Sequence, residues 1–268
     1  MSYLNRFKTN LMFIIKLTRF LYWVPTLQQN LTASLLLLIL SSIDTSKFVY
    51  FLFFAIIQIF LFAYTFVVND VGDKEVDIKA GKIKPIQRYS KKKIALILSV
   101  LAGGSLFIPL YYGSFLVNVV SISTFLLLTF YSLKPFRFKE RGIWGILVAD
   151  GAQRSALFLI FGLFISAPPL LIAFFMGWLF IIGFQDELNH QLMDIDADEK
   201  SGACTWVQHV GHEYGEKVLI ASLILSSIYL ILPFLFLTLL LACIVSIALF
   251  IFRATTMQII YEKIFFSK

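Results

Sequence analysis

Eight apolar runs follow one another along this chain, each close to the roughly 20 residues that a helix needs to cross a bilayer. Hydrophobic residues make up 59% of the sequence, above the share of about one half that is usual for soluble domains. We therefore predict an all-α, polytopic transmembrane protein. The expected spans are Leu17–Leu40, Phe48–Val68, Ile94–Tyr111, Phe115–Tyr131, Ile143–Phe164, Pro168–Phe184, Val218–Leu232 and Phe234–Phe252.

Charged residues gather on alternate connections between these runs. Nearly all of them lie in Lys74–Lys93, Lys134–Arg141, Glu187–Lys217 and the two termini. Because cytoplasmic connections are rich in Lys and Arg, this face is expected to be cytoplasmic. The net charge of +7 then follows from topology and from contact with anionic membrane lipids, without a nucleic-acid partner. The basic N-terminus ahead of the first run indicates an uncleaved span and not a signal peptide.

A first acidic cluster, Asn69 to Asp77, follows the second apolar run. Asp70, Asp73 and Asp77 recur at three and four residues, so they share one face if the helix continues through them. Grouped oxygen ligands suit Mg²⁺, which commonly joins one or two carboxylates to the phosphates of a substrate. The alternative is a solvated acidic loop that closes the helix, and Gly72 weakens a regular helix at this point.

A second acidic cluster follows the sixth run. Its members recur every four residues, which on a helix forms one stripe; they are Asp186, His190, Asp194 and Asp198. An ionised Asp at the centre of a spanning helix costs about 2.5 to 3.5 kcal/mol, so carboxylates beside a bilayer need compensating cations. We interpret the two clusters as halves of one Mg²⁺ site, with His190 favoured as a hydrogen-bond partner over a metal ligand.

Basic residues complete the pattern. Lys82 and Lys84 follow the first cluster, and the string from Tyr131 to Arg141 closes the fourth run. Cationic side chains beside a metal stabilise a departing phosphoryl group where water is excluded. The arrangement predicts a diphosphate site, while basic connections of this kind also serve membrane orientation alone.

Three segments together resemble the motifs of the UbiA superfamily of intramembrane prenyltransferases. Asn69 to Asp77 matches the family's NDxxDxxxD pattern at every fixed position, and Tyr131 to Arg141 resembles its YSxxPxRxKxR loop. Asp194 to Thr205 is similar to the second DxxxD motif and its continuation. Their order and spacing also agree, so the resemblance extends from the first run to about Gly211.

The resemblance implies one domain over residues 1–268, a bundle of about eight or nine spans around a central cavity that cytoplasmic loops cap. It implies transfer of a prenyl group from an isoprenyl diphosphate to an aromatic or lipid acceptor. The implied Mg²⁺ ligands are Asn69, Asp73, Asp77, Asp194 and Asp198, with Asp70 supporting them. The implied diphosphate contacts are Arg19, Lys82, Lys84, Lys134, Arg137, Lys139 and Arg141. Asp73 and Asp194 are expected to be catalytic, and Tyr131 is expected to lie near the developing allylic cation.

Other interpretations stay open at this point. A UbiA-type terpene cyclase uses the same charged residues but lets the prenyl chain capture its own cation. A non-enzymatic carrier of ions or lipids is the third, although carriers usually place charges near the centres of spans. Asp150 and Arg154, one helical turn apart in the fifth run, suit a structural ion pair and an acceptor site equally.

Overall fold

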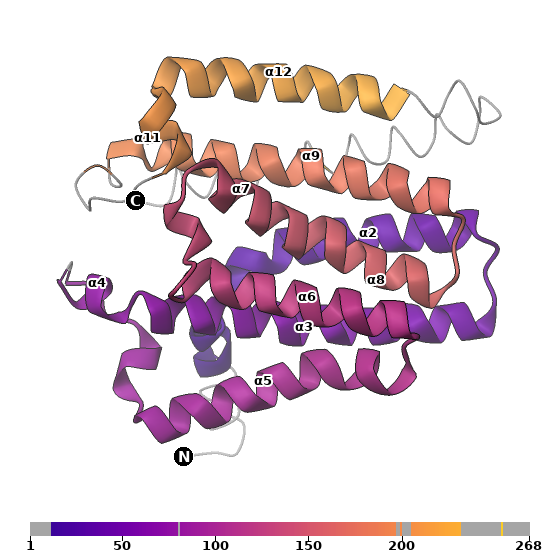
Figure 1. The fold of residues 1–268 in the computed structure, drawn as a ribbon, viewed down its shortest axis with the longest axis horizontal. Helices are drawn as coiled ribbons and strands as arrows, with labels where there is room; N and C mark the ends of the chain where they lie inside the picture. The colour runs from indigo at the N-terminus through magenta and orange to yellow at the C-terminus, as the bar shows by residue number, and fades with distance from the viewer. Residues whose placement is uncertain (1–11, 80, 197–198, 200–204, 232–252, 254–268) are drawn as a thin grey trace. The chain divides into compact units, whose positions relative to one another are not determined.

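The computed structural model describes residues 12–79, 81–196, 199, 205–231 and 253 (Figure 1). The chain divides into two compact units, Met1–Leu219 and Ile220–Lys268. The first unit contains every element up to the start of α12. In the second unit, the end of α12 and Arg253 are described, and Arg253 donates a hydrogen bond to Ser226 Oγ at 2.9 Å.

Seven helices within the described residues are long and apolar enough to cross a membrane. They are α2 (Phe20–Leu40), α3 (Thr45–Gly72), α5 (Lys91–Tyr112), α6 (Phe115–Ser132), the continuous α7 (Ile143–Asp150), η3 (Gly151–Ala156) and α8 (Leu157–Phe164), α9 (Pro169–Met193) and α12 (His212–Ile231). The prediction of an all-helical, multi-pass membrane protein is confirmed. The eighth expected run, 234–252, lies outside the described residues.

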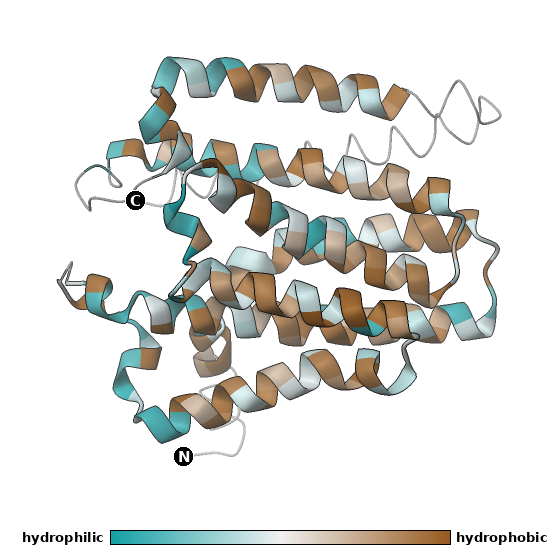
Figure 2. Ribbon diagram, in the orientation of Figure 1, coloured by the Kyte–Doolittle hydropathy of each residue, from teal (hydrophilic) through white to brown (hydrophobic). Residues whose placement is uncertain are grey.

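Short helices join the spans at the polar end. They are α4 (Lys74–Lys79), η1 (Pro85–Arg88), η2 (Phe138–Glu140) and α11 (Trp206–Val210). At the opposite end the connections are brief and double as helix caps. The Asp44 carboxylate accepts from the Lys47 amide at 2.8 Å and so begins α3. Figure 2 shows the hydrophilic colouring concentrated in α4, in the segment before α5 and around η2.

The core of the first unit forms around α3, which packs against α2, α5, α6 and α8. Large aromatic side chains fill it, and the Phe54 and Phe161 rings stack with centroids 5.1 Å apart. By contrast, only 11% of the apolar stretch of α5 is buried inside the protein, and Leu96, Val100 and Phe107 are exposed on this helix. Exposed apolar side chains on this scale suit contact with lipid chains.

The fifth span is one helix with an irregular centre. Its six-residue η3 segment is π-helical, between the regular helices α7 and α8. A π-helical turn holds an extra residue and so changes the direction in which side chains leave the helix, often at functional sites. Arg154 lies within it and is buried.

Two adjacent glycines on α5 provide a matched test of the contact between α3 and α5. A Cβ on Gly104 would lie 2.3 Å from the Phe60 ring of α3, whereas a Cβ on Gly103 would meet nothing within 4 Å. We expect Gly104→Ala to destabilise the protein by about 1–3 kcal/mol through overpacking. Gly103→Ala is expected to be neutral or to stabilise, because Ala favours a helix over Gly by about 1 kcal/mol. Unfolding of both variants in the same detergent checks this, and equal effects would contradict it.

Candidate active site

The polar ends of α3 and α6 meet at a glycine. A Cβ on Gly72 would lie 2.6 Å from the Ser132 carbonyl oxygen, so only glycine permits this approach. One turn earlier, the Ser132 hydroxyl donates to Asn69 Oδ1 at 2.9 Å. The residue that weakens the expected helix therefore has a packing role: α3 ends at Gly72, and α4 begins at Lys74 after Asp73.

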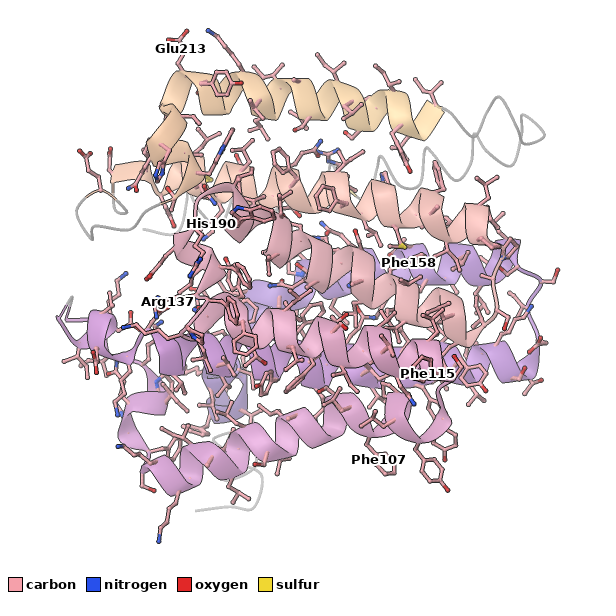
Figure 3. The ribbon with its side chains drawn as sticks, in the orientation of Figure 1. Phe107, Phe115, Arg137, Phe158, His190 and Glu213 are labelled. Atoms are coloured by element: carbon pink, nitrogen blue, oxygen red, sulfur yellow. The ribbon has the colours of Figure 1, made fainter. Side chains whose placement is uncertain are left out.

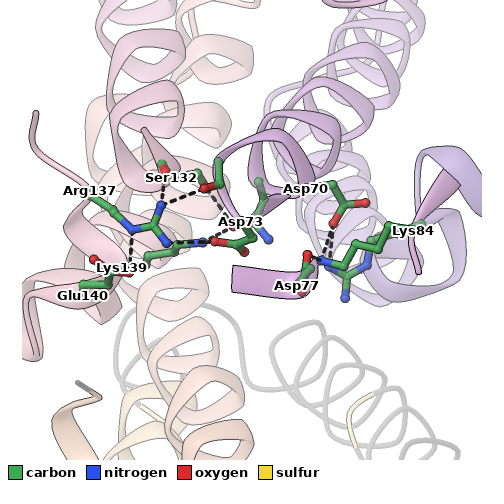
Figure 4. Close-up of polar contacts among 11 residues, drawn as sticks. Asp70, Asp73, Asp77, Lys84, Ser132, Arg137, Lys139 and Glu140 are labelled. Carbon is green, nitrogen blue, oxygen red and sulfur yellow. Dashed lines mark hydrogen bonds and ion pairs between the residues drawn. The ribbon is translucent and has the colours of Figure 1, made fainter. Parts of the chain in front are cut away.

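The basic loop after α6 folds back onto this junction, as Figure 4 shows. Arg137 has a left-handed backbone with φ 44°, and its guanidinium donates to Asp73 Oδ1 at 3.0 Å and to the Gly72 carbonyl oxygen at 3.0 Å. The Lys139 ammonium contacts Asp73 Oδ1 and donates to Asn69 Oδ1 at 2.8 Å. The side-chain oxygens of Asn69, in α3, and of Asp73, its C-cap, thus both contact the Lys139 ammonium. We call Asn69, Asp73, Ser132, Arg137 and Lys139 the Asp73 cluster.

The surroundings affect the charge of Lys139. Burial lowers the pKa of Lys139 below its ordinary value, and attraction to Asp73 opposes this only in part. An additional anion in the Asp73 cluster would favour the protonated ammonium. The cluster is therefore suited to receiving a negatively charged ligand.

Asp70 and Asp77 belong to a second group on the other side of the junction. The Lys84 ammonium lies 2.8 Å from Asp70 Oδ1 and 2.7 Å from Asp77 Oδ2, and Arg19 is 3.5 Å from Asp70. Burial by itself lowers the pKa of Lys84, but its hydrogen bonds to the two carboxylates outweigh burial and raise it. The three aspartates of the first motif do not share one set of partners, because Asp73 pairs with Arg137 and Lys139 while the other two pair with Lys84.

Lys84 is expected to contribute to stability. Within the described residues, Lys84→Met leaves the buried Asp70 with only the longer Arg19 contact, and we expect the free energy of unfolding to fall by about 1–3 kcal/mol. Because the native pKa of Lys84 is raised, its contribution is fully present below the unfolded lysine pKa of about 10.4 and is lost only as pH rises through the higher native value. The difference in unfolding free energy from the parent protein should therefore be constant between about pH 6 and pH 9. Lys82→Met, at an exposed position, is the control; an equal loss in it would contradict the prediction.

The remaining basic candidates lie outside both groups. Lys82, Lys134 and Arg141 are exposed, and none of them forms an ion pair within the described part of the chain. Arg141 instead donates to the carbonyl oxygens of Pro135 and Phe136 in its own loop. It thus holds the shape of the loop that carries Arg137 and Lys139.

The second acidic cluster divides between two environments. Asp194 ends α9, is half-exposed, and its Oδ2 lies 3.4 Å from His190 Nδ1. Asp198 lies outside the described residues. Asp186 instead faces the bundle interior, where the Arg154 guanidinium reaches it at 2.7 Å. Within the described residues, no three acidic, histidine or cysteine side chains lie together closely enough to hold a metal ion.

The interior contacts of Asp186 connect the Asp150 and Arg154 pair, which the sequence analysis named as an ion pair or an acceptor site, with Gln29, which it missed. Arg154 also contacts Asp150 at 2.6 Å and donates to Gln29 Oε1 at 3.1 Å. Gln29 is buried in α2, and its amide donates to Asp186 at 3.2 Å. The polar run Gln28-Gln29-Asn30 inside an otherwise apolar span was the available sequence signal.

Tyr131 is partly buried, one residue before the end of α6 and next to Ser132 of the Asp73 cluster. The helix that carries it packs against α3 and also against α7 and η3. No hydrogen bond of its hydroxyl is present among the described residues.

Comparison with known proteins gives one family and a consistent fold. The model of the UbiA prenyltransferase family matches residues 30–263. A UbiA homolog from Archaeoglobus fulgidus, solved bound to GPP and Mg²⁺, is similar with a TM-score of 0.72 and 16% identity, covering 94% of this chain and 88% of that one. The same homolog bound to DMAPP and Mg²⁺ has a TM-score of 0.72 and 17% identity, covering 93% of this chain and 87% of that one. A structure of digeranylgeranylglyceryl phosphate synthase has a TM-score of 0.66 and 17% identity, covering 94% of this chain and 88% of that one. No curated protein matches in sequence.

Proposed function

Because the chain belongs to the UbiA prenyltransferase family, we propose that it transfers a prenyl group from an isoprenyl diphosphate to an aromatic or lipid acceptor and releases pyrophosphate. The observation that carries this proposal is the Asp73 cluster, where Arg137 and Lys139 converge on Asn69 and Asp73. Two cations and two oxygen ligands at the polar end of apolar helices fit a diphosphate headgroup whose hydrocarbon chain lies between the spans.

The donor set of the site fits Mg²⁺. Oxygens of Asn69 and Asp73 already converge on one ammonium, and a hard divalent ion takes the same carboxylate and amide oxygens. Asp70 Oδ2 is buried without a hydrogen-bond partner among the described residues. The residues that would hold the ion are Asn69, Asp73 and Asp77 with Asp194 and Asp198, supported by Asp70. Bound there, Mg²⁺ would neutralise charge on the departing diphosphate. The solved homolog with GPP and Mg²⁺ supports this cofactor.

The side chains of this chain have distinct tasks in the proposed reaction. Arg137 and Lys139 bind the diphosphate and stabilise the charge that grows on it as the bond to the prenyl C1 breaks. Tyr131 presents its aromatic face to the carbon that gains cationic character. The acceptor's nucleophilic atom then bonds to C1, the electron pair of the broken C–O bond leaves with pyrophosphate, and the acceptor loses one proton. The apolar spans exclude water, which would otherwise capture the cation.

Basic side chains outside the Asp73 cluster are also proposed to contact the diphosphate. Lys84 and Arg19 lie beside Asp70, and the exposed Lys82, Lys134 and Arg141 border the same polar end. These connections carry the basic residues, so we propose that they face the cytoplasm. We treat residues 1–268 as one prenyltransferase domain of a cell-membrane protein.

Product analysis tests transfer against its main alternative, a terpene cyclase, which would use the same donor site. Membranes containing the protein are incubated with Mg²⁺ and labelled geranyl, farnesyl or geranylgeranyl diphosphate, with and without aromatic and lipid acceptors. A product heavier than its acceptor by one prenyl unit is expected. A free terpene formed without acceptor would favour the cyclase instead. The carrier interpretation has no support from the family match.

A further inference from the structure

A charged group lies inside the bundle, separate from the Asp73 cluster. Arg154 of η3 contacts Asp150 at the end of α7 at 2.6 Å and Asp186 of α9 at 2.7 Å. Gln29 of α2 joins it by accepting from Arg154 at 3.1 Å and donating to Asp186 at 3.2 Å. We call Gln29, Asp150, Arg154 and Asp186 the interior charge group. Three spans that are distant in sequence, α2, the span formed by α7, η3 and α8, and α9, therefore meet at one polar point.

This group contains more acidic side chains than cations. Asp150 and Asp186 share one guanidinium. Glu187 beside them is partly buried, and among the described residues its hydrogen-bond partner is the Gln191 amide at 3.2 Å. Among the described residues, Arg154 is the only cationic side chain within salt-bridge distance of these carboxylates. An unpaired polar oxygen away from water is costly unless it gains a hydrogen-bond partner. Excess acceptor oxygens indicate that a hydrogen-bond donor from outside the chain completes the group.

The free acceptor atom is identifiable. Asp150 is 2% exposed, and its Oδ2 is buried without a hydrogen-bond partner in the part of the chain that the structure describes. The Asp186 side chain, at 25% exposure, is the more accessible of the two carboxylates. The backbone also makes room for the group, since a Cβ on Gly183 would lie 2.6 Å from Asp150 Oδ1 and 2.8 Å from Arg154. The π-helical turn of η3 then aims Arg154 at both carboxylates.

The position of the group relative to the donor site suits an acceptor. Tyr131 lies near the end of α6, and α6 packs against α7 and η3, which carry Asp150 and Arg154, as well as against α3, which leads to Asp73. The interior charge group and the Asp73 cluster thus belong to helices that pack against the same helix. A molecule bound at the interior group would therefore lie among the helices that carry the donor site.

We propose that the interior charge group, with Glu187, binds the polar head of the prenyl acceptor and selects neutral or cationic hydroxyl-bearing acceptors over carboxylate- or phosphate-bearing ones. This inference rests on the proposed function and specifies its acceptor. A hydroxyl group can share a hydrogen bond with the unpartnered Asp150 Oδ2, whereas an anion would be held against three acidic side chains in a site of low polarity. Arg154, the one guanidinium in contact with Asp150 and Asp186 in the described part of the chain, is already engaged by both, so it does not offer an anion a free binding site.

Matched acceptor pairs test this selection. One pair is 4-hydroxybenzyl alcohol and 4-hydroxybenzoate, and the other is a 1-O-alkylglycerol and its phosphate. The purified full-length protein in lipid nanodiscs is supplied with Mg²⁺ and labelled prenyl diphosphate, and initial rates of prenylation are compared within each pair. The neutral member of the accepted pair should react at least about tenfold faster than its anionic partner.

Charge-neutralising variants connect the selection to these residues. Asp186→Asn keeps the size of the side chain and removes one charge, so the preference for the neutral acceptor should fall by about tenfold. Glu187→Gln breaks no ion pair among the described residues and should also lower the ratio of the neutral to the anionic rate. This variant replaces Asp186→Asn in the test if Asp186→Asn does not fold. The control is Glu213→Gln on α12 (Figure 3), an exposed carboxylate that pairs with Lys217 and should leave the ratio unchanged.

Binding of a prenyl thiodiphosphate analogue, measured with Mg²⁺ in the same preparation, separates the two claims. Intact donor binding with a faster anionic acceptor in either pair would overturn the acceptor inference and leave the proposed function in place. Intact donor binding with ratios unchanged in both variants would also overturn it. Absence of Mg²⁺-dependent donor binding would overturn the proposed function itself.

Discussion

Replacement of Asp73 by asparagine is expected to lower the rate of prenyl transfer by at least about 100-fold. Asp73 receives both Arg137 and Lys139, so it positions the two cations that would hold the diphosphate. The amide also has a weaker affinity for Mg²⁺ than the carboxylate, and it offers its two nitrogen-bound hydrogens to groups that are donors themselves. Initial rates with saturating donor and acceptor measure the effect.

A neighbouring carboxylate provides the control for Asp73. Glu75→Gln changes an exposed acid in the same segment and should retain the parent rate within about twofold, because surface substitutions of this kind have small effects. Asp194→Asn, in the second acidic cluster, is expected to abolish turnover as well. Both aspartate variants should still insert into membranes. If both kept the parent activity, the assignment of the site would be wrong.

Arg154→Met is expected to destabilise the protein by about 3–5 kcal/mol, because it leaves Asp150 and Asp186 without their cation inside the bundle. Gln29 would lose a donor at the same time. Reversible unfolding in mixed detergent micelles measures the loss. The effect should be much smaller in an Asp150→Asn background, since one of the two stranded charges is then absent.

The unfolding free energies of the two single variants and the double variant also show whether Arg154 and Asp150 are coupled. A simple sum of the two single effects would show that Arg154 and Asp150 are not coupled, in conflict with their 2.6 Å contact. Gly183→Ala approaches the same contact from α9 and should also destabilise, because its Cβ would overlap Asp150 and Arg154. The ratio of the rates with neutral and anionic acceptors is measured only on variants that keep Arg154.

The transmembrane organisation was predictable because it depends on the length and polarity of segments, which sequence displays directly. Ile143–Phe164 was expected as one span and is one span, although its π-helical centre has no periodic signature in so apolar a run. The second span was expected over Phe48–Val68, with either a helix or a loop continuing through the acidic cluster, and α3 ends at Gly72 within that cluster. The role of Gly72 was not expected, since it depends on the Ser132 carbonyl of a helix some sixty residues later.

Site residues were predictable as types but not as partners. The motif spacing grouped Asp70, Asp73 and Asp77, whereas the fold brings Lys84 to two of them and the loop after α6 to the third. Likewise, the four-residue stripe joined Asp186 to Asp194, but helix packing directs Asp186 toward Arg154. Contacts between distant segments decide such partners, and a single sequence does not contain them.

If Asp73 and its neighbours hold a Mg²⁺–diphosphate complex, pyrophosphate release should depend on Mg²⁺. Purified protein in nanodiscs receives a prenyl diphosphate and a lipid and aromatic acceptor pool, and pyrophosphate is measured as Mg²⁺ is titrated against EDTA. The account predicts saturable release that EDTA abolishes and that the Asp73→Asn variant lacks. Release that is unchanged in EDTA, or equal in the parent and the variant, would contradict it.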